Sequence, residues 1–169
     1  MKNLKNWDQK TWLSSSRYIS SITNFLEKKI KFNKEIKILD IGCGRGKIIS
    51  TLSKKYQMIN LPLGIDIVDH KDVTIKIRFT KANALRYLSK TKEKFNLILF
   101  KQSIHFFSFE EIKKILKYSK KNLYPEGKII ILALHSKKNN WPSFKVFKKK
   151  LTQSLKKDKK ILDLIKFNF

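Results

Sequence analysis

The chain is poor in several residue types, and each shortage excludes something. Its 169 residues contain one cysteine, Cys43, so neither an internal disulfide nor a cysteine-based zinc site is possible. The longest apolar run, residues 129–134, falls far short of the roughly 20 residues that span a bilayer. No apolar segment of signal-peptide length follows the N-terminal residues. We therefore expect a soluble, cytoplasmic protein of one domain.

Acidic residues are also scarce, with 13 of them against 39 basic residues and a formal charge of +26. Only four of the basic residues are arginines, so 39 − 4 = 35 are lysines, spread along the whole chain. Arginine is the residue favoured for bidentate phosphate recognition. Few alanines and many isoleucines and asparagines are typical of an AT-rich coding bias. Whether the charge serves a function or only reflects composition stays open. Non-specific binding of polyanions is expected under both interpretations.

The few glycines are concentrated in one place. Of five in the chain, three lie in Gly42-Cys43-Gly44-Arg45-Gly46, directly after the apolar run that ends in Asp40 and Ile41. From residue 35 onward, short strand-like runs alternate with helical ones, which is typical of βαβ units and a parallel sheet. The expected strands are 36–41, 62–68, 73–79, 95–100 and 127–134, and the expected helices are 47–55, 82–89 and 109–122.

The two ends of the chain differ from this alternating part. Near the N-terminus, Tyr18, Ile19, Ile22, Phe25, Leu26 and Ile30 recur at helical spacing after serines that can cap a helix, which predicts an amphipathic helix packed on the core. Residues 136–169 predict a lysine-rich helical tail, and the last residues, 164–169, are compatible with the start of a sixth strand. We therefore divide the chain into an N-terminal segment, 1–34, a core, 35–135, and a tail, 136–169.

The glycine loop is expected at the carboxyl edge of the sheet, where open α/β sheets bind their ligands. Glycine there lets the backbone approach a ligand closely and adopt positive φ. The dinucleotide pattern G-x-G-x-x-G would need a glycine at position 47, where this chain has Lys47. The longer spacing of a P-loop is absent as well.

Residues Ile38 to Gly46 resemble the first motif of the class I S-adenosylmethionine-dependent methyltransferases, and the resemblance extends over about residues 35–135. It implies a Rossmann-like, doubly wound, mostly parallel sheet with helices on both faces, and S-adenosyl-L-methionine as the cofactor. In this family the glycine loop, here Gly42, Cys43 and Gly44, lies along the methionine part of the cofactor. The acid at the strand end, here Asp40, organises the loop and the amino group of the ligand.

The resemblance also implies an adenosine site on the next two strands. Asp66 corresponds to the acid that binds both ribose hydroxyls, and Ile67 follows it. After the third strand, Asn83 stands where the family usually has an aspartate that binds the adenine amino group, and a small residue, Ala84, follows. An amide oxygen can still accept a hydrogen bond. Asn83 as the N-cap of the next helix is the alternative.

The segment after the fourth strand faces the reacting end of the cofactor in this family. There the backbone carbonyl of Lys101 and the side chain of Gln102 are candidate contacts for the methionine part or the substrate. His105 is the candidate catalytic base, since imidazole titrates near neutral pH. The alternative is that His105 only packs in the core. His135 and Trp141 are weaker candidates for the substrate pocket. Methyl transfer requires no metal and no covalent residue.

The acceptor is less clearly defined by the sequence than the cofactor. The segment after the fourth strand lacks the Asp/Asn-Pro-Pro-aromatic tetrad and the Pro-Cys pair of known nucleic-acid-modifying branches, so the resemblance favours a small-molecule acceptor. Two alternatives remain: an RNA methyltransferase, because of the charge, and an inactive cofactor-binding partner subunit. The second rests on Asn83, on Asn96, which stands where the family often has an acid, and on a C-terminal part that offers little sign of the last two strands of the family's sheet. If these C-terminal strands are missing, the edge of the sheet is unpaired, and an oligomer or a partner protein could cover it.

Overall fold

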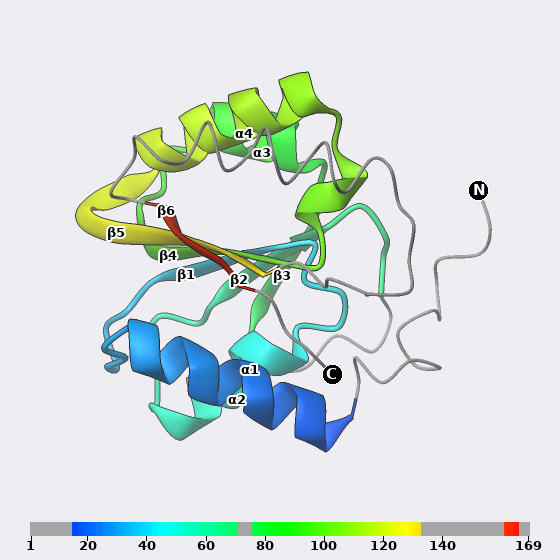
Figure 1. Cartoon of the computed structure of the whole chain (residues 1–169). Coiled ribbons are helices and arrows are strands. Elements are labelled where there is room, and N and C mark those ends of the chain that lie inside the picture. The colour runs from blue at the N-terminus through cyan, green and yellow to red at the C-terminus, as the bar shows by residue number, and fades with distance from the viewer. Residues whose placement is uncertain (1–14, 71–75, 133–160, 166–169) are drawn as a thin grey trace.

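A computed structural model describes residues 15–70, 76–132 and 161–165 of the chain. Its strands form one parallel sheet in the order β3-β2-β1-β4-β5-β6, with α1 and α2 on one face and α3 and α4 on the other (Figure 1). This confirms the predicted doubly wound α/β fold. The elements are α1 (Ser16–Lys29), β1 (Ile38–Ile41), α2 (Lys47–Lys55), β2 (Leu63–Asp66), β3 (Arg78–Lys81), α3 (Ala84–Lys90), β4 (Phe95–Lys101), the 3₁₀ turn η3 (Ile104–Phe106), α4 (Phe109–Lys121), β5 (Leu123–Leu132) and β6 (Ile161–Ile165).

Strand β4 lies in the middle of the sheet and is buried on both faces. Ile98 and Phe100 belong to the core cluster shared with α3 and α4, whereas Leu97 and Leu99 belong to the cluster shared with α1 and α2. Successive side chains of a strand point to opposite faces, so a strand covered by helices on both sides has to be apolar throughout. The continuous apolar run of this strand therefore fixes its central place.

The predicted N-terminal helix is confirmed as α1. The side chain of Ser15 accepts a hydrogen bond from the backbone N–H of Tyr18 at 3.2 Å and caps the helix. Tyr18, Ile22 and Leu26, three residues of the predicted stripe, are buried against α2 and the sheet. The stripe thus covers one face of the core, and it brings Tyr18 under the carboxyl edge of the sheet.

The connection between β2 and β3 is unusually short for two parallel strands. It comprises residues 67–77, and its described parts, 67–70 and 76–77, contain no helix. The strand predicted over 73–79 is wrong in its bounds, because β3 starts only at Arg78. Ile77 instead turns into the core between the sheet and α1 and α2, where it packs against Gly46 of the glycine loop.

Strand β5 starts earlier than predicted. Leu123 already pairs with Phe95, and the regular register begins at Lys128, which pairs with Leu97. The intervening residues, 124–127, bulge out of the ladder. The turn-forming residues that predicted a strand start at Gly127 therefore produce an irregularity inside a longer strand.

The predicted helical tail is wrong for residues 161–165. They form β6, which pairs in parallel with β5. The expectation of a sixth strand near the C-terminus is thus met, although this strand begins at Ile161. His135 and Trp141 lie outside the described residues, and the division of the chain at residues 34 and 135 stays a prediction.

Gly46→Ala should destabilise the fold. The φ of Gly46 is +70°, and an added Cβ would lie 2.2 Å from Cδ1 of Ile77. The left-handed backbone alone costs an alanine about 1–2 kcal/mol. We expect urea unfolding to show at least this loss, and a smaller loss in an Ile77→Val background, which lacks the clashing methyl group. Equal losses in both backgrounds would rule out the contact with Ile77 as a cause.

Candidate functional site

The glycine loop sits at the carboxyl end of β1 and is fixed by backbone hydrogen bonds. The N–H groups of Gly42 and Cys43 donate to the carbonyl of Ile65 in β2 at 2.8 and 3.1 Å, and Gly46 N–H donates to the carbonyl of Cys43 at 3.0 Å. Gly42, Gly44 and Gly46 all have positive φ. The three glycines are therefore required by the path of the loop, which turns sharply into α2.

Asp66, at the end of β2, anchors this loop. Its Oδ2 accepts a hydrogen bond from Gly44 N–H at 2.9 Å, and its Oδ1 accepts one from Val68 N–H at 3.0 Å. A carboxylate has about four lone-pair positions, so each oxygen can still accept one more hydrogen bond. The role of organising the loop, predicted for Asp40, belongs to Asp66.

Asp40 is the most unusual group of the site. It is 0% exposed, and neither carboxylate oxygen has a hydrogen-bond partner in the described part of the chain. Burial raises its pKa to about 7, the positive charge of Lys101 opposes this rise, and the negative charge of Asp66 adds to it. A buried carboxyl group without donors is costly, and it fits a ligand that brings a positive charge with N–H donors.

Gln102 and Ser103 follow β4 and form the wall opposite the loop. Gln102 has a φ of +58°, is buried, and its N–H donates to the carbonyl of Leu132 at 2.8 Å. The hydroxyl of Ser103 donates to the carbonyl of Ile41. A Cβ at Gly42 would lie 2.4 Å from Cβ of Ser103, so loop and wall are in direct contact.

Tyr18 reaches this wall from α1, which the sequence did not predict. Burial raises the pKa of Tyr18 to about 12, the nearby side chain of Gln102 opposes this rise, and the negative charge of Asp40 adds to it. The apolar spacing of α1 identified Tyr18 only as a core residue. Its hydroxyl group was the one signal of a polar role.

His70 is a second residue that sequence reasoning missed. Its side chain is 3% exposed, its Nε2 lies 3.9 Å from Oδ2 of Asp66, and its Nδ1 has no hydrogen-bond partner among the described residues. The imidazole of His70 therefore lies next to the carboxylate of Asp66, the predicted ribose-binding acid. The spacing of four residues from Asp66 was visible in the sequence, but a bend rather than a helix brings the two together.

His105 lies in the 3₁₀ turn η3 after β4. Its ring centroid is 4.2 Å from that of Phe106, whose side chain is among the most exposed apolar ones described, at 66%. Burial lowers the pKa of His105 below its ordinary value of 6.5, so the imidazole is neutral at pH 7 and able to accept a proton.

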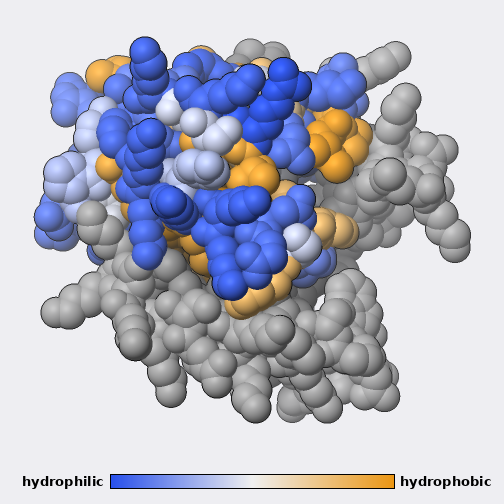
Figure 2. All heavy atoms as spheres, turned by 90° about the horizontal axis from the view of Figure 1, so that it is seen from above, coloured by the Kyte–Doolittle hydropathy of each residue, from blue (hydrophilic) through white to orange (hydrophobic). Residues whose placement is uncertain are grey.

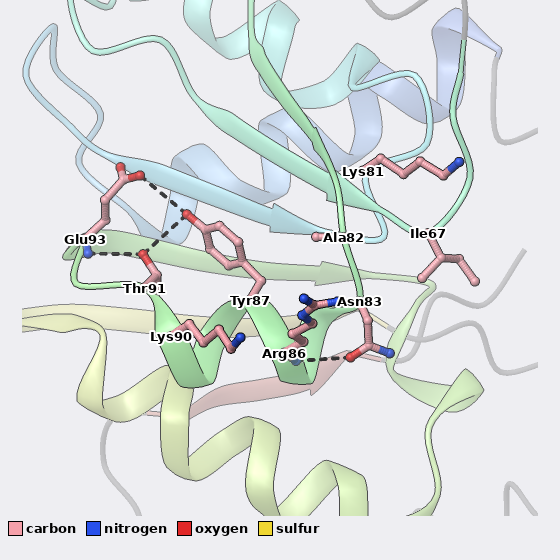
Figure 3. Close-up of a pocket in the computed structure, with 9 residues that line it drawn as sticks. All are labelled: Ile67, Lys81, Ala82, Asn83, Arg86, Tyr87, Lys90, Thr91 and Glu93. Atoms are coloured by element: carbon pink, nitrogen blue, oxygen red, sulfur yellow. Dashed lines mark hydrogen bonds between the residues drawn. The ribbon is translucent and has the colours of Figure 1, made fainter.

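Asn83 and Ile67 lie on a hollow of about 630 Å³ beside α3 (Figure 3). Asn83 Oδ1 accepts from Arg86 N–H at 3.1 Å and caps α3, so the alternative role as N-cap is confirmed. Ala84 packs in the core. Lys101 ends β4, and a contact through its carbonyl stays a prediction.

Cys43 has a packing role in the loop. Its thiol donates to the carbonyl of Gly44 at 3.3 Å, and burial raises its pKa. A Cβ at Gly64 would lie 2.6 Å from its Sγ. The small cysteine side chain thus fits against a glycine of β2.

Comparison with known proteins identifies the family. A family model described as "Methyltransferase domain" matches residues 38–127, which carry the glycine loop, Asp40, Asp66 and Asn83. The chain belongs to the methyltransferase domain family. This confirms the predicted recognition, and S-adenosylmethionine is the cofactor of the family; the activity of this chain itself stays a proposal.

Solved methyltransferases share the fold at low identity. The plantazolicin methyltransferase BpumL, in complex with SAH, is 22% identical with a TM-score of 0.64, over 91% of this chain and 68% of its own. The plantazolicin methyltransferase BamL, in complex with a triazolic desmethylPZN analog and SAH, is 26% identical with a TM-score of 0.57, over 72% and 47%. A SAM dependent methyltransferase from Archaeoglobus fulgidus is 22% identical with a TM-score of 0.55, over 66% and 51%.

The chain thus spans only about half of the Archaeoglobus fulgidus protein, 51% of its length. No curated protein matches it. None of the described helices has the length and apolar character needed to cross a membrane. A cytoplasmic location, an oligomer and polyanion binding stay predictions.

Asp40→Asn should stabilise the fold by an amount that depends on pH. Because the pKa of Asp40 is about 7 in the folded chain and 3.8 ordinarily, stability is lost as the pH rises from about 4 to about 7. At about 1.4 kcal/mol for each unit of pKa difference, the loss is on the order of a few kcal/mol. Urea unfolding should show the advantage of the asparagine variant growing over this window and levelling off above it. A difference that is constant with pH would contradict the buried, ionising carboxylate.

Proposed function

We propose that this chain binds S-adenosylmethionine at the carboxyl edge of β1, β2 and β4 and transfers its methyl group to a small-molecule acceptor. The observation that carries the proposal is the unpartnered carboxylate of Asp40, buried at the edge where the glycine loop and Asp66 meet. The cofactor has an ammonium group and two ribose hydroxyls, and the two acids match these groups.

The residues present fit the cofactor in the order in which its parts follow one another. Asp40 would hold the amino group, Gly42 to Gly44 would leave room for the methionine chain, and Asp66 would accept from the ribose hydroxyls. Ile67 and Asn83, which border the hollow beside α3, would lie at the adenine end. Gln102, which lies close to Tyr18, would close the methionine end.

When bound, the cofactor supplies an electrophilic methyl group on a sulfonium. The chain has to align the acceptor, exclude water and take up a proton. His105 is unprotonated at pH 7 and stands beside the exposed ring of Phe106, which offers an apolar surface to an acceptor. We therefore assign the uptake of the acceptor's proton to His105.

A small acceptor is favoured by the plantazolicin methyltransferases. BamL was solved with a triazolic desmethylPZN analog, and it shares 26% identity over 72% of this chain. Asn96, the second departure from the family pattern, accepts from Lys37 N–H at 2.8 Å. It therefore has a structural role away from the candidate site, and its presence does not argue for an inactive subunit.

Asp66→Ala should weaken S-adenosylmethionine binding by roughly 1.5–3 kcal/mol. The variant loses both the acceptors for the ribose and the anchor of Gly44. Asp66→Asn keeps one acceptor oxygen, so its affinity for the cofactor should lie between that of the wild type and that of Asp66→Ala. Isothermal titration calorimetry with S-adenosylmethionine and its demethylated product measures the effect. Asp69→Ala, which removes an exposed carboxylate nearby, is the matched control. An unchanged affinity in Asp66→Ala would remove this residue from the site, and no heat with the wild-type chain would refute the proposal.

His105→Gln should reduce methyl transfer while leaving cofactor affinity unchanged. The assay incubates small-molecule extracts with cofactor carrying a labelled methyl group and follows incorporation against pH. Because burial lowers the pKa of His105, the wild-type rate should fall only below the ordinary pKa of 6.5, and the glutamine variant should lose this acid limb. A wild-type rate and pH profile in the variant would leave His105 with a packing role only.

A further inference from the structure

The hollow beside α3 extends well past the residues predicted at the adenine end of the cofactor site. It lies between the end of the edge strand β3, the helix α3 and the start of the connection to β4 (Figure 3). One end of the hollow is formed by Ile67, Ala82 and Asn83. The remaining lining residues have no place in the proposed cofactor site; they are Lys81, Arg86, Tyr87, Lys90, Thr91 and Glu93.

The charge of this lining is positive and uncompensated. Lys81, Arg86 and Lys90 take part in no ion pair between described residues. Glu93 is the one carboxylate of the lining, and it is already bound to Arg78 at 2.8 Å. The hollow therefore presents three cations to a ligand and one carboxylate that is neutralised from outside.

The cations are arranged along the hollow. Arg86 and Lys90 lie one turn apart on α3, about 6 Å along its axis, and Figure 3 shows both on the side of Tyr87. The Tyr87 hydroxyl lies 3.4 Å from Glu93 and 3.5 Å from Thr91, which fixes its ring. An extended chain of phosphates with planar bases fits this arrangement better than one isolated phosphate.

The surface around the hollow continues the same chemistry. Seen from the side of α3 and α4, the described surface is mostly hydrophilic, with apolar side chains in separate patches (Figure 2). The exposed lysines of α4 on this part of the molecule are Lys113, Lys114, Lys117, Lys120 and Lys121. A polyanion leaving the hollow would therefore meet further positive charge.

We propose that the hollow between β3 and α3 binds the backbone of a single-stranded RNA, with Arg86 and Lys90 each contacting a phosphate and Tyr87 contacting a base. This inference goes beyond methyl transfer to a small acceptor and does not require the RNA to be the acceptor. It differs from binding by net charge, because it assigns the affinity to two named side chains.

The experiment measures fluorescence anisotropy of a labelled oligouridine of about 12 nucleotides at increasing salt. Arg86→Gln/Lys90→Gln removes two positive charges from the hollow. Lys28→Gln/Lys54→Gln removes two from exposed positions on α1 and α2, on the opposite face of the sheet. We expect the first pair to lower affinity on the order of tenfold at low salt, and to reduce the slope of log K against log salt by about 1.4, at about 0.7 per phosphate contact. Lys28→Gln/Lys54→Gln should change both the affinity and the salt slope by much less.

Equal effects of the two double variants would overturn the proposal, since binding would then follow net charge alone. So would displacement of the RNA by millimolar-range inorganic phosphate or adenosine monophosphate at constant ionic strength, because the hollow would then be a pocket for a single phosphate. All four substituted side chains are exposed, so folding is not at risk, and the single variants Arg86→Gln and Lys90→Gln should each reduce the slope by about half as much. Calorimetry with S-adenosylmethionine on Arg86→Gln/Lys90→Gln should give wild-type affinity. The cofactor proposal and the RNA proposal can thus fail independently.

Discussion

The hydrogen bond between Gly44 N–H and Asp66 holds the two halves of the candidate site together. The glycine loop follows β1, and Asp66 ends β2, so this contact couples the loop that would carry the methionine part of the cofactor to the acid that would hold its ribose. Ile65 reinforces the coupling through two backbone hydrogen bonds. These bonds are all made within the chain, so the position of the loop relative to β2 is set by the protein itself.

Asp40, unlike Asp66, has its carboxylate buried without a hydrogen bond from the described residues, which lowers the stability of the fold. It gains no hydrogen bond from the described chain, and burial disfavours its charged form. Such a group lowers stability, and it is retained where a ligand compensates it. A ligand that compensates this acid would bring hydrogen-bond donors, a positive charge, or both, and the ammonium group of S-adenosylmethionine would supply the two together.

The sequence was sufficient where the pattern is local. The glycine triplet, the stripe of α1 and the acid at the end of β2 follow from spacing alone, because positive φ, helical periodicity and strand ends leave direct marks in a sequence. The start of β3 and the contact of Ile77 with Gly46 could not be predicted in this way. The same holds for His70 beside Asp66. These features arise when distant segments pack. Strand β6 adds another case, because residues 161–165, a mostly apolar segment of the tail predicted to be helical, pair with an existing strand instead.

Tyr18 brings α1 close to the candidate site, in addition to the cover that this helix gives the sheet. The family match begins at residue 38, yet the phenol near Gln102 and Asp40 comes from twenty residues upstream of it, on a helix that the family model does not include. A variant cut to the matched region would expose the apolar residues that pack under α1. It would also remove the phenol from one wall of the candidate site, so the loss of this helix is expected to reach beyond stability.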